Sequence, residues 1–327
     1  MDMEQRRLGR TGIMVSLLGY GCGAIGGLMV KGTEAEQERA IGRAIEAGVT
    51  YFDTAAAYGD GASERNLGRV LKTLRAEVTL GTKVRIRGEQ RGDIAGAIAA
   101  SVEASLARLG RDAVDILHLH EPITFAGEPP AFTPERILND AVPALQRLRE
   151  QGKVRFVGIT GLGDAPALRR VLEEADFATA QMPYNLLNPS GIAPLPPGSG
   201  MPELGGCIRQ AASADVGVMA IRILAGGALS GSEARGPLGV PNVTPIASGV
   251  SYAADAAAAR RFMPLIEAGH AADLVELALR YAAMPPEIAT VLIGTGSIAE
   301  FDHAAAAIAK GPLPPEALVM IEGLRGG

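Results

Sequence analysis

Short apolar runs typical of β-strands alternate along the chain with longer stretches in which apolar residues recur at helical spacing. Eight runs fit strands: one that ends at residues 17–21, then 50–53, 78–83, 114–120, 154–160, 178–181, 216–221 and 290–293. Strands that are separated by helices run parallel in one sheet. The pattern therefore predicts an α/β fold built from repeated strand and helix units.

The boundaries of two helices can be predicted from capping residues. Thr33 and Glu36 have the spacing of a capping box, which indicates a helix from there to about residue 48. Asp93 stands as a possible N-cap before an apolar stripe, and Gly110 can take the left-handed position after it. Two further helical stripes are Leu67, Val70, Leu71 and Leu74, and Leu274, Leu277, Ala278 and Tyr281.

A parallel sheet of this kind is either an open, doubly wound sheet or a closed barrel. Eight strands favour the (β/α)₈ TIM barrel, and 327 residues lie within its usual size. No shift in composition marks a linker, so we expect one domain over residues 1–327. Glycine- and proline-rich stretches at 189–206 and 226–249 follow the sixth and seventh strands. Loops at that end of a barrel build the active site.

Composition and charge exclude several classes of protein. The chain is 47% hydrophobic and 20% charged, so it is not disordered, and a net charge of −5 without a basic run argues against nucleic acid. Cys22 and Cys207 are too few for a disulfide framework and have no metal-ligand spacing, so no metal is expected. The polar first ten residues and the lack of a long apolar run predict a soluble cytoplasmic protein without membrane contact. We expect a monomer or small homo-oligomer.

Residues 21–26 match the GxGxxG pattern of dinucleotide-binding Rossmann folds, and Asp53 ends the next strand. The context does not fit, because the helix signal begins at Thr33, seven residues beyond Gly26. These glycines are then not at a helix N-terminus, where a diphosphate would bind. They either let the backbone approach a flat ligand at the barrel mouth or serve as ordinary loop glycines.

Chemically active side chains stand at or just after the ends of three consecutive strands. Asp53 ends one strand and Tyr58 follows five residues later, Lys83 ends the next strand, and His120 ends the third. A tyrosine ordinarily titrates near pH ~10, and a cation beside it would lower that pKa. Each residue alone also fits a structural role. Because these strand ends meet at one mouth, we predict that the four side chains converge there.

These motifs resemble those of the aldo-keto reductase family, and the likeness runs from Leu8 to about Pro315. The resemblance implies a catalytic tetrad of Asp53, Tyr58, Lys83 and His120. Tyr58 would be the general acid in reduction and the base in oxidation, Lys83 paired with Asp53 would tune its pKa, and His120 would orient the substrate oxygen. It further implies an NAD(P)(H)-dependent oxidoreductase that reduces an aldehyde or ketone to an alcohol, or the reverse, on a small molecule. The motifs that carry it are Asp53-Thr54-Ala55, Tyr58-Gly59, Ser63-Glu64, Leu67-Gly68, Gly81-Thr82-Lys83 and Asp115 with His120.

The same resemblance implies a set of cofactor-binding residues. Gln181 corresponds to the glutamine that binds the nicotinamide carboxamide, whereas its usual Ser-Asn partners are replaced by Thr160 and Gly161. Ile221 stands where an aromatic ring usually underlies the nicotinamide. Arg222 replaces a small Ser and would reach a diphosphate or a substrate carboxylate, or form a salt bridge at the rim. The implied set is Gly21, Cys22, Asp53, Thr160, Gln181, Ile221, Arg222, Gly294, Thr295, Ser297 and Glu300.

The cofactor and the substrate stay open at this stage. Family habit favours NADP(H), but Gly296 stands where NADP-selective members carry Arg or Lys, and the usual Glu-Asn pair becomes His303-Ala304, so NAD(H) is possible. One alternative is an NAD-dependent sugar or alcohol dehydrogenase of the same family. Another is a non-catalytic, nicotinamide-sensing regulatory subunit. We expect the loops at 122–134, 186–206 and 225–249 to shape the substrate pocket.

Overall fold

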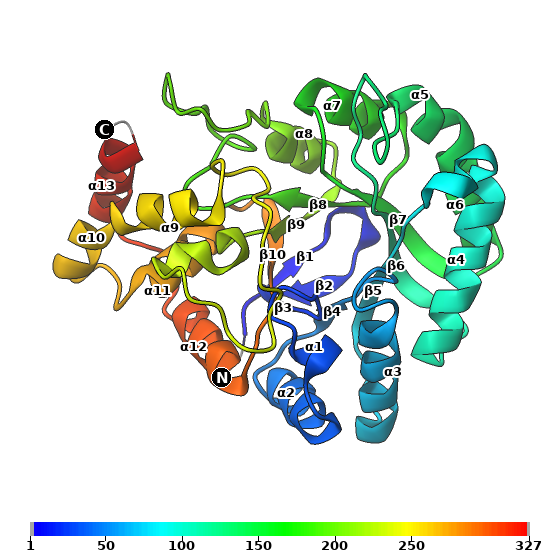
Figure 1. The fold of residues 1–327 in the computed structure, drawn as a ribbon, viewed down its shortest axis with the longest axis horizontal. Helices are drawn as coiled ribbons and strands as arrows, with labels where there is room; N and C mark the ends of the chain where they lie inside the picture. Colours follow the sequence, from blue (N-terminus) through cyan, green and yellow to red (C-terminus); the bar gives the residue numbers. More distant parts are fainter. Residues whose placement is uncertain (1–2, 326–327) are drawn as a thin grey trace.

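Eight parallel strands close into a barrel in the computed structural model, which describes residues 3–325. Their order around the barrel is β10-β3-β4-β5-β6-β7-β8-β9 (Figure 1). All eight predicted strands and the TIM-barrel class are confirmed, with boundaries that differ by at most two residues. Residues 1, 2, 326 and 327 of the predicted domain lie outside the described residues. The strands are β3 (Leu18–Gly21), β4 (Tyr51–Asp53), β5 (Thr79–Val84), β6 (Val114–Leu119), β7 (Val154–Thr160), β8 (Thr179–Pro183), β9 (Gly217–Ile221) and β10 (Ile288–Ile293).

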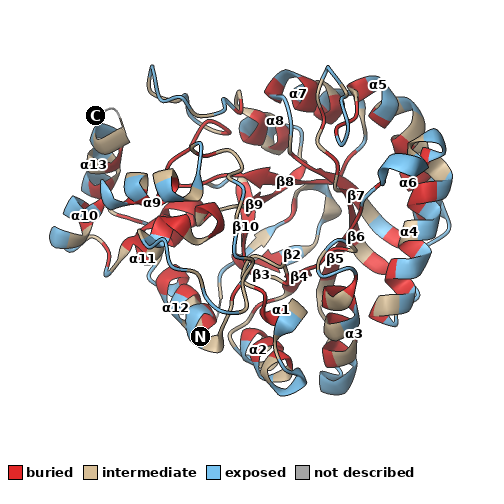
Figure 2. Cartoon of the chain, in the orientation of Figure 1, coloured by how far each residue is buried: buried red, intermediate tan, exposed pale blue. Residues whose placement is uncertain are grey.

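Helices surround the barrel and turn their buried faces toward it, as Figure 2 shows, and these faces consist mainly of hydrophobic residues. Among residues 3–325, no helix is both long and apolar enough to cross a membrane. The longer helices are α2 (Glu34–Glu46), α3 (Ala62–Leu74), α4 (Ile94–Leu109), α6 (Val142–Glu150), α7 (Ala165–Glu174), α9 (Tyr252–Arg260), α11 (Leu274–Ala283), α12 (Ile298–Ala309) and α13 (Pro315–Arg325). Shorter helical segments are η1 (Gly9–Thr11), α1 (Leu28–Lys31), η2 (Gly88–Gly92), α5 (Pro134–Arg136), η3 (Ile137–Ala141), α8 (Cys207–Ser213), η4 (Ala225–Ser230) and α10 (Met263–Glu267).

The predicted helix caps are present. The Thr33 hydroxyl accepts the Glu36 backbone N–H at 3.3 Å, and the Glu36 carboxylate accepts the Thr33 backbone N–H at 2.8 Å. At the start of α4 the Asp93 carboxylate accepts the Gly96 N–H at 2.9 Å. Gly110 ends that helix at φ 63°, a left-handed conformation that glycine adopts without steric cost.

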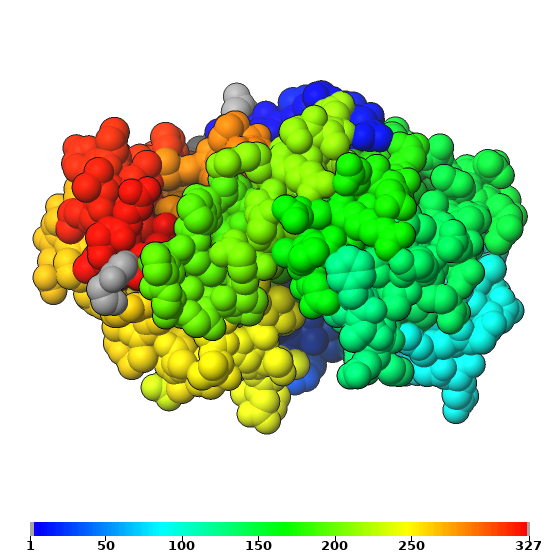
Figure 3. All heavy atoms as spheres, turned by 90° about the horizontal axis from the view of Figure 1, so that it is seen from above, coloured from blue at the N-terminus to red at the C-terminus, as the bar shows by residue number. Residues whose placement is uncertain are grey.

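A hairpin that the sequence pattern did not predict closes the N-terminal end of the barrel. It consists of β1 (Gln5–Arg7) and β2 (Met14–Ser16), which pair antiparallel. Leu8 and Val15 are fully buried inside the barrel, in a cluster with Tyr51, Ile116, Met219, Ala289 and Leu292. In Figure 3 this blue segment lies at the edge opposite the yellow segment near residue 250. Because the hairpin and this cluster fill the N-terminal end of the barrel, the C-terminal end is the open one.

Candidate active site

A cavity of about 740 Å³ lies at the C-terminal mouth of the barrel. This volume is in the range of small-molecule sites, about 300 to 1,000 Å³. One end is lined by Tyr58 and His120, and the other by residues at the start of α12 such as Thr295 and His303. Polar side chains thus line the cavity both at the strand ends and near the start of α12.

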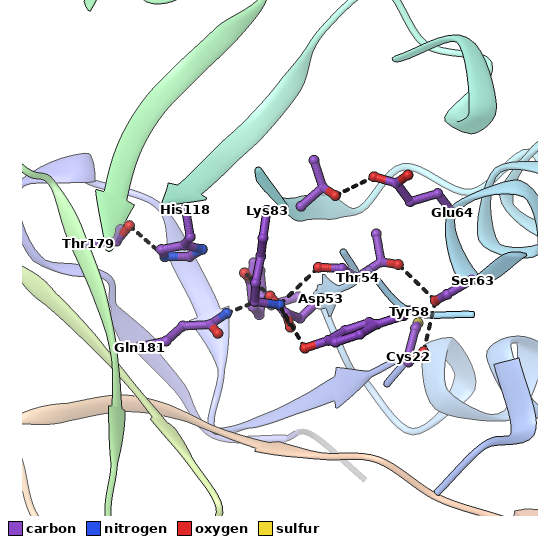
Figure 4. Close-up of polar contacts among 12 residues, drawn as sticks. Cys22, Asp53, Thr54, Tyr58, Ser63, Glu64, Lys83, His118, Thr179 and Gln181 are labelled. Carbon is purple, nitrogen blue, oxygen red and sulfur yellow. Dashed lines mark hydrogen bonds and ion pairs between the residues drawn. The ribbon is translucent and has the colours of Figure 1, made fainter. Parts of the chain in front are cut away.

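Three members of the predicted tetrad form one hydrogen-bonded cluster (Figure 4). Lys83 is the next-to-last residue of β5, and its Nζ donates to Asp53 Oδ2, to the Thr54 carbonyl at 2.9 Å and to the Tyr58 hydroxyl at 3.2 Å. Lys83 and Asp53 are only 1% and 4% exposed, so this ion pair is buried. The structure thus places a cation against the phenol at the cavity wall.

His120, the fourth member, follows the end of β6 and lines the cavity. Its ring stands edge-on to Tyr58, with centroids 6.0 Å apart and planes at 87°. Burial lowers the His120 pKa to about 3, and the positive charges of Lys83 and Arg85 act in the same direction. The imidazole is therefore neutral near pH 7 and can only hydrogen-bond to a ligand, not supply a charge.

The Tyr58 pKa lies above its ordinary value. Burial raises this pKa, and the attraction of Lys83 for the phenolate offsets only part of the rise, while the Asp53 charge adds to it. Lys83 thus lowers the Tyr58 pKa, as expected of a neighbouring cation, but burial has the larger effect. The Lys83 pKa is also raised, because the charges of Asp53 and Tyr58 outweigh the effect of burial. Tyr58 is consequently protonated and Lys83 charged near pH 7.

The neighbourhood of Gln181 fits a bound carboxamide. Gln181 lines the cavity, and its Nε2 donates to Asp53 Oδ1 at 2.5 Å. Thr160, its cross-strand partner, presents a buried hydroxyl that has no hydrogen-bond partner in the described structure. A Cβ at Gly161 would lie 2.1 Å from the Met182 sulfur, so a larger residue there would require the Met182 side chain to move. Thr160 thus keeps a polar atom free next to the space that Met182 fills.

Most of the other residues predicted to bind cofactor also line the cavity: Gly21, Ile221, Arg222, Gly294, Thr295 and Glu300. Cys22 and Ser297 do not appear among the described lining residues. The Cys22 N–H donates to the Asp53 carbonyl and its own carbonyl accepts from Ser63, both at 2.8 Å, so its backbone polar groups are already used. Ser297 caps α12 by accepting the Glu300 N–H at 3.2 Å.

The glycines of the 21–26 segment serve close packing of two loops. A Cβ at Gly26 would lie 2.5 Å from the Thr295 backbone, and one at Gly21 would lie 2.9 Å from the Ile293 carbonyl oxygen. The helix that follows, α1, has only four residues. The segment forms one wall of the cavity against the loop after β10, which agrees with the rejection of a Rossmann fold.

Arg222 stands just beyond β9 in a left-handed conformation, φ 57°, that is strained for a residue with a side chain. It is half-buried, and its Nη1 donates to the Thr244 carbonyl at 3.1 Å. Burial lowers the pKa of the guanidinium. None of the ion pairs within residues 3–325 includes Arg222, so the predicted rim salt bridge is absent from that part of the chain. A cation with free N–H groups therefore faces the cavity.

Arg235 is a cavity residue that the sequence pattern did not reveal. Its guanidinium donates to the carbonyls of Gly226 at 2.7 Å, Val240 at 2.8 Å and Ile25 at 2.9 Å, and it lies over the Tyr252 ring. These bonds hold the segment after β9 against the 21–26 segment. Three loops are expected from the sequence to shape the pocket. Of these three, within residues 3–325, only the loop at 225–249 lines the cavity. No sequence signal links Arg235 to Ile25, which lies 210 positions earlier.

The far end of the cavity carries an acidic side chain, that of Glu300. Glu300 lines it and accepts the Gly296 N–H at 2.7 Å. His303 pairs with Asp273 at 3.1 Å. Lys310, another candidate cation, pairs with Glu276 at 2.5 Å and is not among the described lining residues. Lys310 therefore offers a phosphate nothing at this end, whereas Arg235, which lines the cavity next to Gly236 and forms none of the ion pairs within residues 3–325, is a cation near Glu300.

Comparison with known proteins places this geometry in a family. Residues 17–325 match the aldo/keto reductase family. The chain is 30% identical to an Arabidopsis thaliana L-galactose dehydrogenase over 94% of its own length and 89% of the relative's. It is 32% identical to an Escherichia coli NADH-specific methylglyoxal reductase over 57% of its own length and 60% of the relative's. An aldo-keto reductase from Bacillus halodurans superposes with a TM-score of 0.71 at 24% identity, covering 98% of this chain and 96% of that one.

Proposed function

Because the chain belongs to the aldo/keto reductase family of oxidoreductases, we propose that it transfers hydride between NAD(P)(H) and a carbonyl/alcohol pair, with Tyr58 as general acid and base. The observation that carries this proposal is the contact of the Tyr58 hydroxyl with the buried Lys83 ammonium, 3.2 Å away at the cavity wall. The test is a comparison of turnover by wild type and by Tyr58→Phe.

In the proposed mechanism the bound nicotinamide supplies or accepts the hydride, and the protein transfers the proton and orients the substrate. In reduction the Tyr58 hydroxyl donates a proton to the substrate oxygen, and Lys83 stabilises the phenolate that this leaves. Asp53 holds Lys83 in place through the buried ion pair. Neutral His120 orients the substrate oxygen by hydrogen bonding. In oxidation the Tyr58 phenolate accepts the alcohol proton.

We propose that side chains at the C-terminal ends of β7, β8 and β9 hold the nicotinamide and the diphosphate. Gln181 and the unpartnered Thr160 hydroxyl are the atoms suited to a carboxamide. Ile221 gives aliphatic packing where a ring would stack. Arg222 has N–H groups available for a diphosphate, since its hydrogen bond to the Thr244 carbonyl uses only one of the five N–H donors of the guanidinium.

The pH dependence of the two directions follows from the shifted pKa values. Since the Tyr58 pKa is raised above about 10 and that of His120 is lowered to about 3, neither group titrates between about pH 6 and pH 9. Below its pKa Tyr58 is protonated, so we expect reduction at saturating substrate to be flat across this range. Oxidation needs the phenolate and should rise about tenfold per pH unit. Measured profiles of kcat would contradict this if reduction fell near pH 7.

We propose that the cofactor site accepts NADH at least as well as NADPH. Glu300 brings a negative charge to the end of the cavity where the 2′-phosphate would lie, and Gly296 offers no cation there. The L-galactose dehydrogenase likeness, which spans 94% of the chain, fits the second candidate function, an NAD-dependent sugar or alcohol dehydrogenase.

Glu300→Gln should tighten NADPH binding by about 3- to 10-fold and change NADH binding by less than about twofold. Gln keeps an oxygen for the Gly296 N–H, so only the charge is removed, and charge repulsion in a solvated site is worth about 1 kcal/mol. Dissociation constants come from reduced-nicotinamide fluorescence. Glu316→Gln, in the exposed first turn of α13, is the control with the same change in net charge. Clearly tighter binding of NADPH than of NADH by the wild type would contradict the proposal.

A further inference from the structure

Tyr51 is a buried tyrosine that the proposed mechanism does not use. It lies on β4 two residues before Asp53, so both side chains point to the barrel interior. Its hydroxyl donates to Asp53 Oδ1 at 3.2 Å, and the residue is 0% exposed. The site therefore has a second phenol, out of reach of substrate, bonded directly to the carboxylate that holds Lys83.

The neighbouring strand has room for this hydroxyl because residue 81 is glycine. A Cβ at Gly81 would lie 2.1 Å from the Tyr51 oxygen, well inside any allowed contact. Gly81 stands two residues before Lys83 on β5, and it pairs with Asp53 across the strands. The glycine of the Gly-Thr-Lys motif thus gives Tyr51 its place against Asp53.

The two oxygens of Asp53 have different partners. Oδ2 accepts from Lys83, whereas Oδ1 accepts from Tyr51 and, at 2.5 Å, from Gln181. Hydrogen bonds to Oδ1 stabilise the negative charge on that oxygen. They thereby weaken the effect of the Asp53 charge on the Tyr58 pKa, which acts against the effect of Lys83. The Asp53 charge raises the Tyr58 pKa and the Lys83 charge lowers it. Any group that partly neutralises Asp53 therefore favours the Tyr58 phenolate.

We propose that Tyr51 is a positioning residue that poises Tyr58 by hydrogen bonding to Asp53, which in turn holds Lys83. The inference rests on the proposed function insofar as Tyr58 is the acid and base. Tyr51 itself touches no substrate. Its removal acts on the proton-transfer group through two intermediate side chains, so its main effect is on a pKa and not on substrate binding.

The groups that face Tyr58 and Tyr51 lie on, or directly follow, five strands of the barrel. Tyr58 is faced by Lys83, Asp53, His120 and Arg222, and Lys83 is also near the fully buried His118 of β6. Burial lowers the His118 and His120 pKa values, so both rings are neutral near pH 7. Tyr51 is faced by Asp53, Gln181 and Tyr58. Asp53, Lys83 and Arg222 therefore supply the charges that decide the Tyr58 pKa among the described residues.

The test is a spectroscopic titration of Tyr58 that needs neither substrate nor cofactor. Phenolate absorbance is recorded against pH for wild type and Tyr51→Phe, each minus its own Tyr58→Phe version, which isolates one phenol among six. Phe at 51 removes only the hydroxyl. We expect the Tyr58 pKa to rise by about 0.5 to 1 unit, a fraction of the stabilisation that a hydrogen bond to a charged group provides. The pH profile of oxidation should shift by the same amount, with KM for the alcohol little changed.

Tyr281→Phe is the matched control. This buried phenol on α11 accepts a hydrogen bond from Tyr184 at 3.1 Å, and neither residue lines the cavity among those described. A Tyr58 pKa in Tyr51→Phe that equals the control would overturn the inference. Should Tyr51→Phe fold poorly, Gly81→Ala displaces the same hydroxyl and is expected to shift the pKa in the same direction. Failure of the wild type to turn over any carbonyl would instead contradict the proposed function, while the titration would still decide the role of Tyr51.

Discussion

Tyr58→Phe is expected to lower the rate of carbonyl reduction by about 10² to 10⁴, the usual effect of losing a general acid. The hydroxyl alone is removed and the ring is kept, so no cavity forms. The groups that we propose for the cofactor lie elsewhere along the cavity, near Gln181, Arg222 and Thr295. The dissociation constant for reduced nicotinamide should therefore change by less than about threefold. Initial rates and fluorescence titrations measure the two quantities.

Tyr281→Phe controls for the loss of a phenol hydroxyl elsewhere in the protein, since Tyr281 lies on α11. It should keep wild-type turnover. If Tyr58→Phe retained near-wild-type rates on the best substrate, Tyr58 would not be the acid. If it lost cofactor binding and turnover together, the hydroxyl would serve binding and not proton transfer.

Lys83→Met should both inactivate the protein and destabilise it. The variant keeps a side chain of similar length but removes the charge that stabilises the Tyr58 phenolate, so turnover should fall by at least about 10². Asp53 would then be a buried carboxylate without its cation, since both residues are less than 5% exposed. Breaking a buried ion pair on one side typically costs about 3 to 5 kcal/mol in the free energy of unfolding. Urea denaturation measures this loss.

A double variant separates the two effects of Lys83. Asp53→Asn combined with Lys83→Met removes both charges, so at least half of the lost stability should return while turnover stays low. Equal destabilisation of the single and double variants would show that packing, and not the unpaired charge, accounts for the loss. Recovery of turnover in the double variant would contradict the proposed role of Lys83.

The barrel and the convergence of Asp53, Tyr58, Lys83 and His120 could be predicted because both depend on local patterns. Strand-like runs alternate with capped helices, and side chains at the ends of parallel strands meet at one mouth whatever the loops do. Asp53, Lys83 and His120 follow from that rule alone. Tyr58 lies five residues beyond its strand, and the turn that ends at α3 brings it back over Lys83.

Other features depend on contacts that sequence spacing does not encode. The β1–β2 hairpin has strands of three residues, too short for a periodic signal. The bond between Arg235 and Ile25 joins segments 210 positions apart. The net direction of the Tyr58 pKa shift required its burial as well as its charged neighbour. The pairing of Tyr51 with Asp53 required the interior packing against Gly81.

One assay addresses the central claim that this chain is a nicotinamide-dependent oxidoreductase. Wild-type protein is mixed with NADH or NADPH and a panel of aldehydes and ketones, or with NAD⁺ or NADP⁺ and a panel of alcohols and aldoses, and nicotinamide absorbance is followed. Binding is measured in parallel by reduced-nicotinamide fluorescence, which the absence of tryptophan favours. We expect turnover that Tyr58→Phe abolishes. Tight cofactor binding without turnover on any member of either panel would contradict the claim and indicate a nicotinamide-sensing subunit.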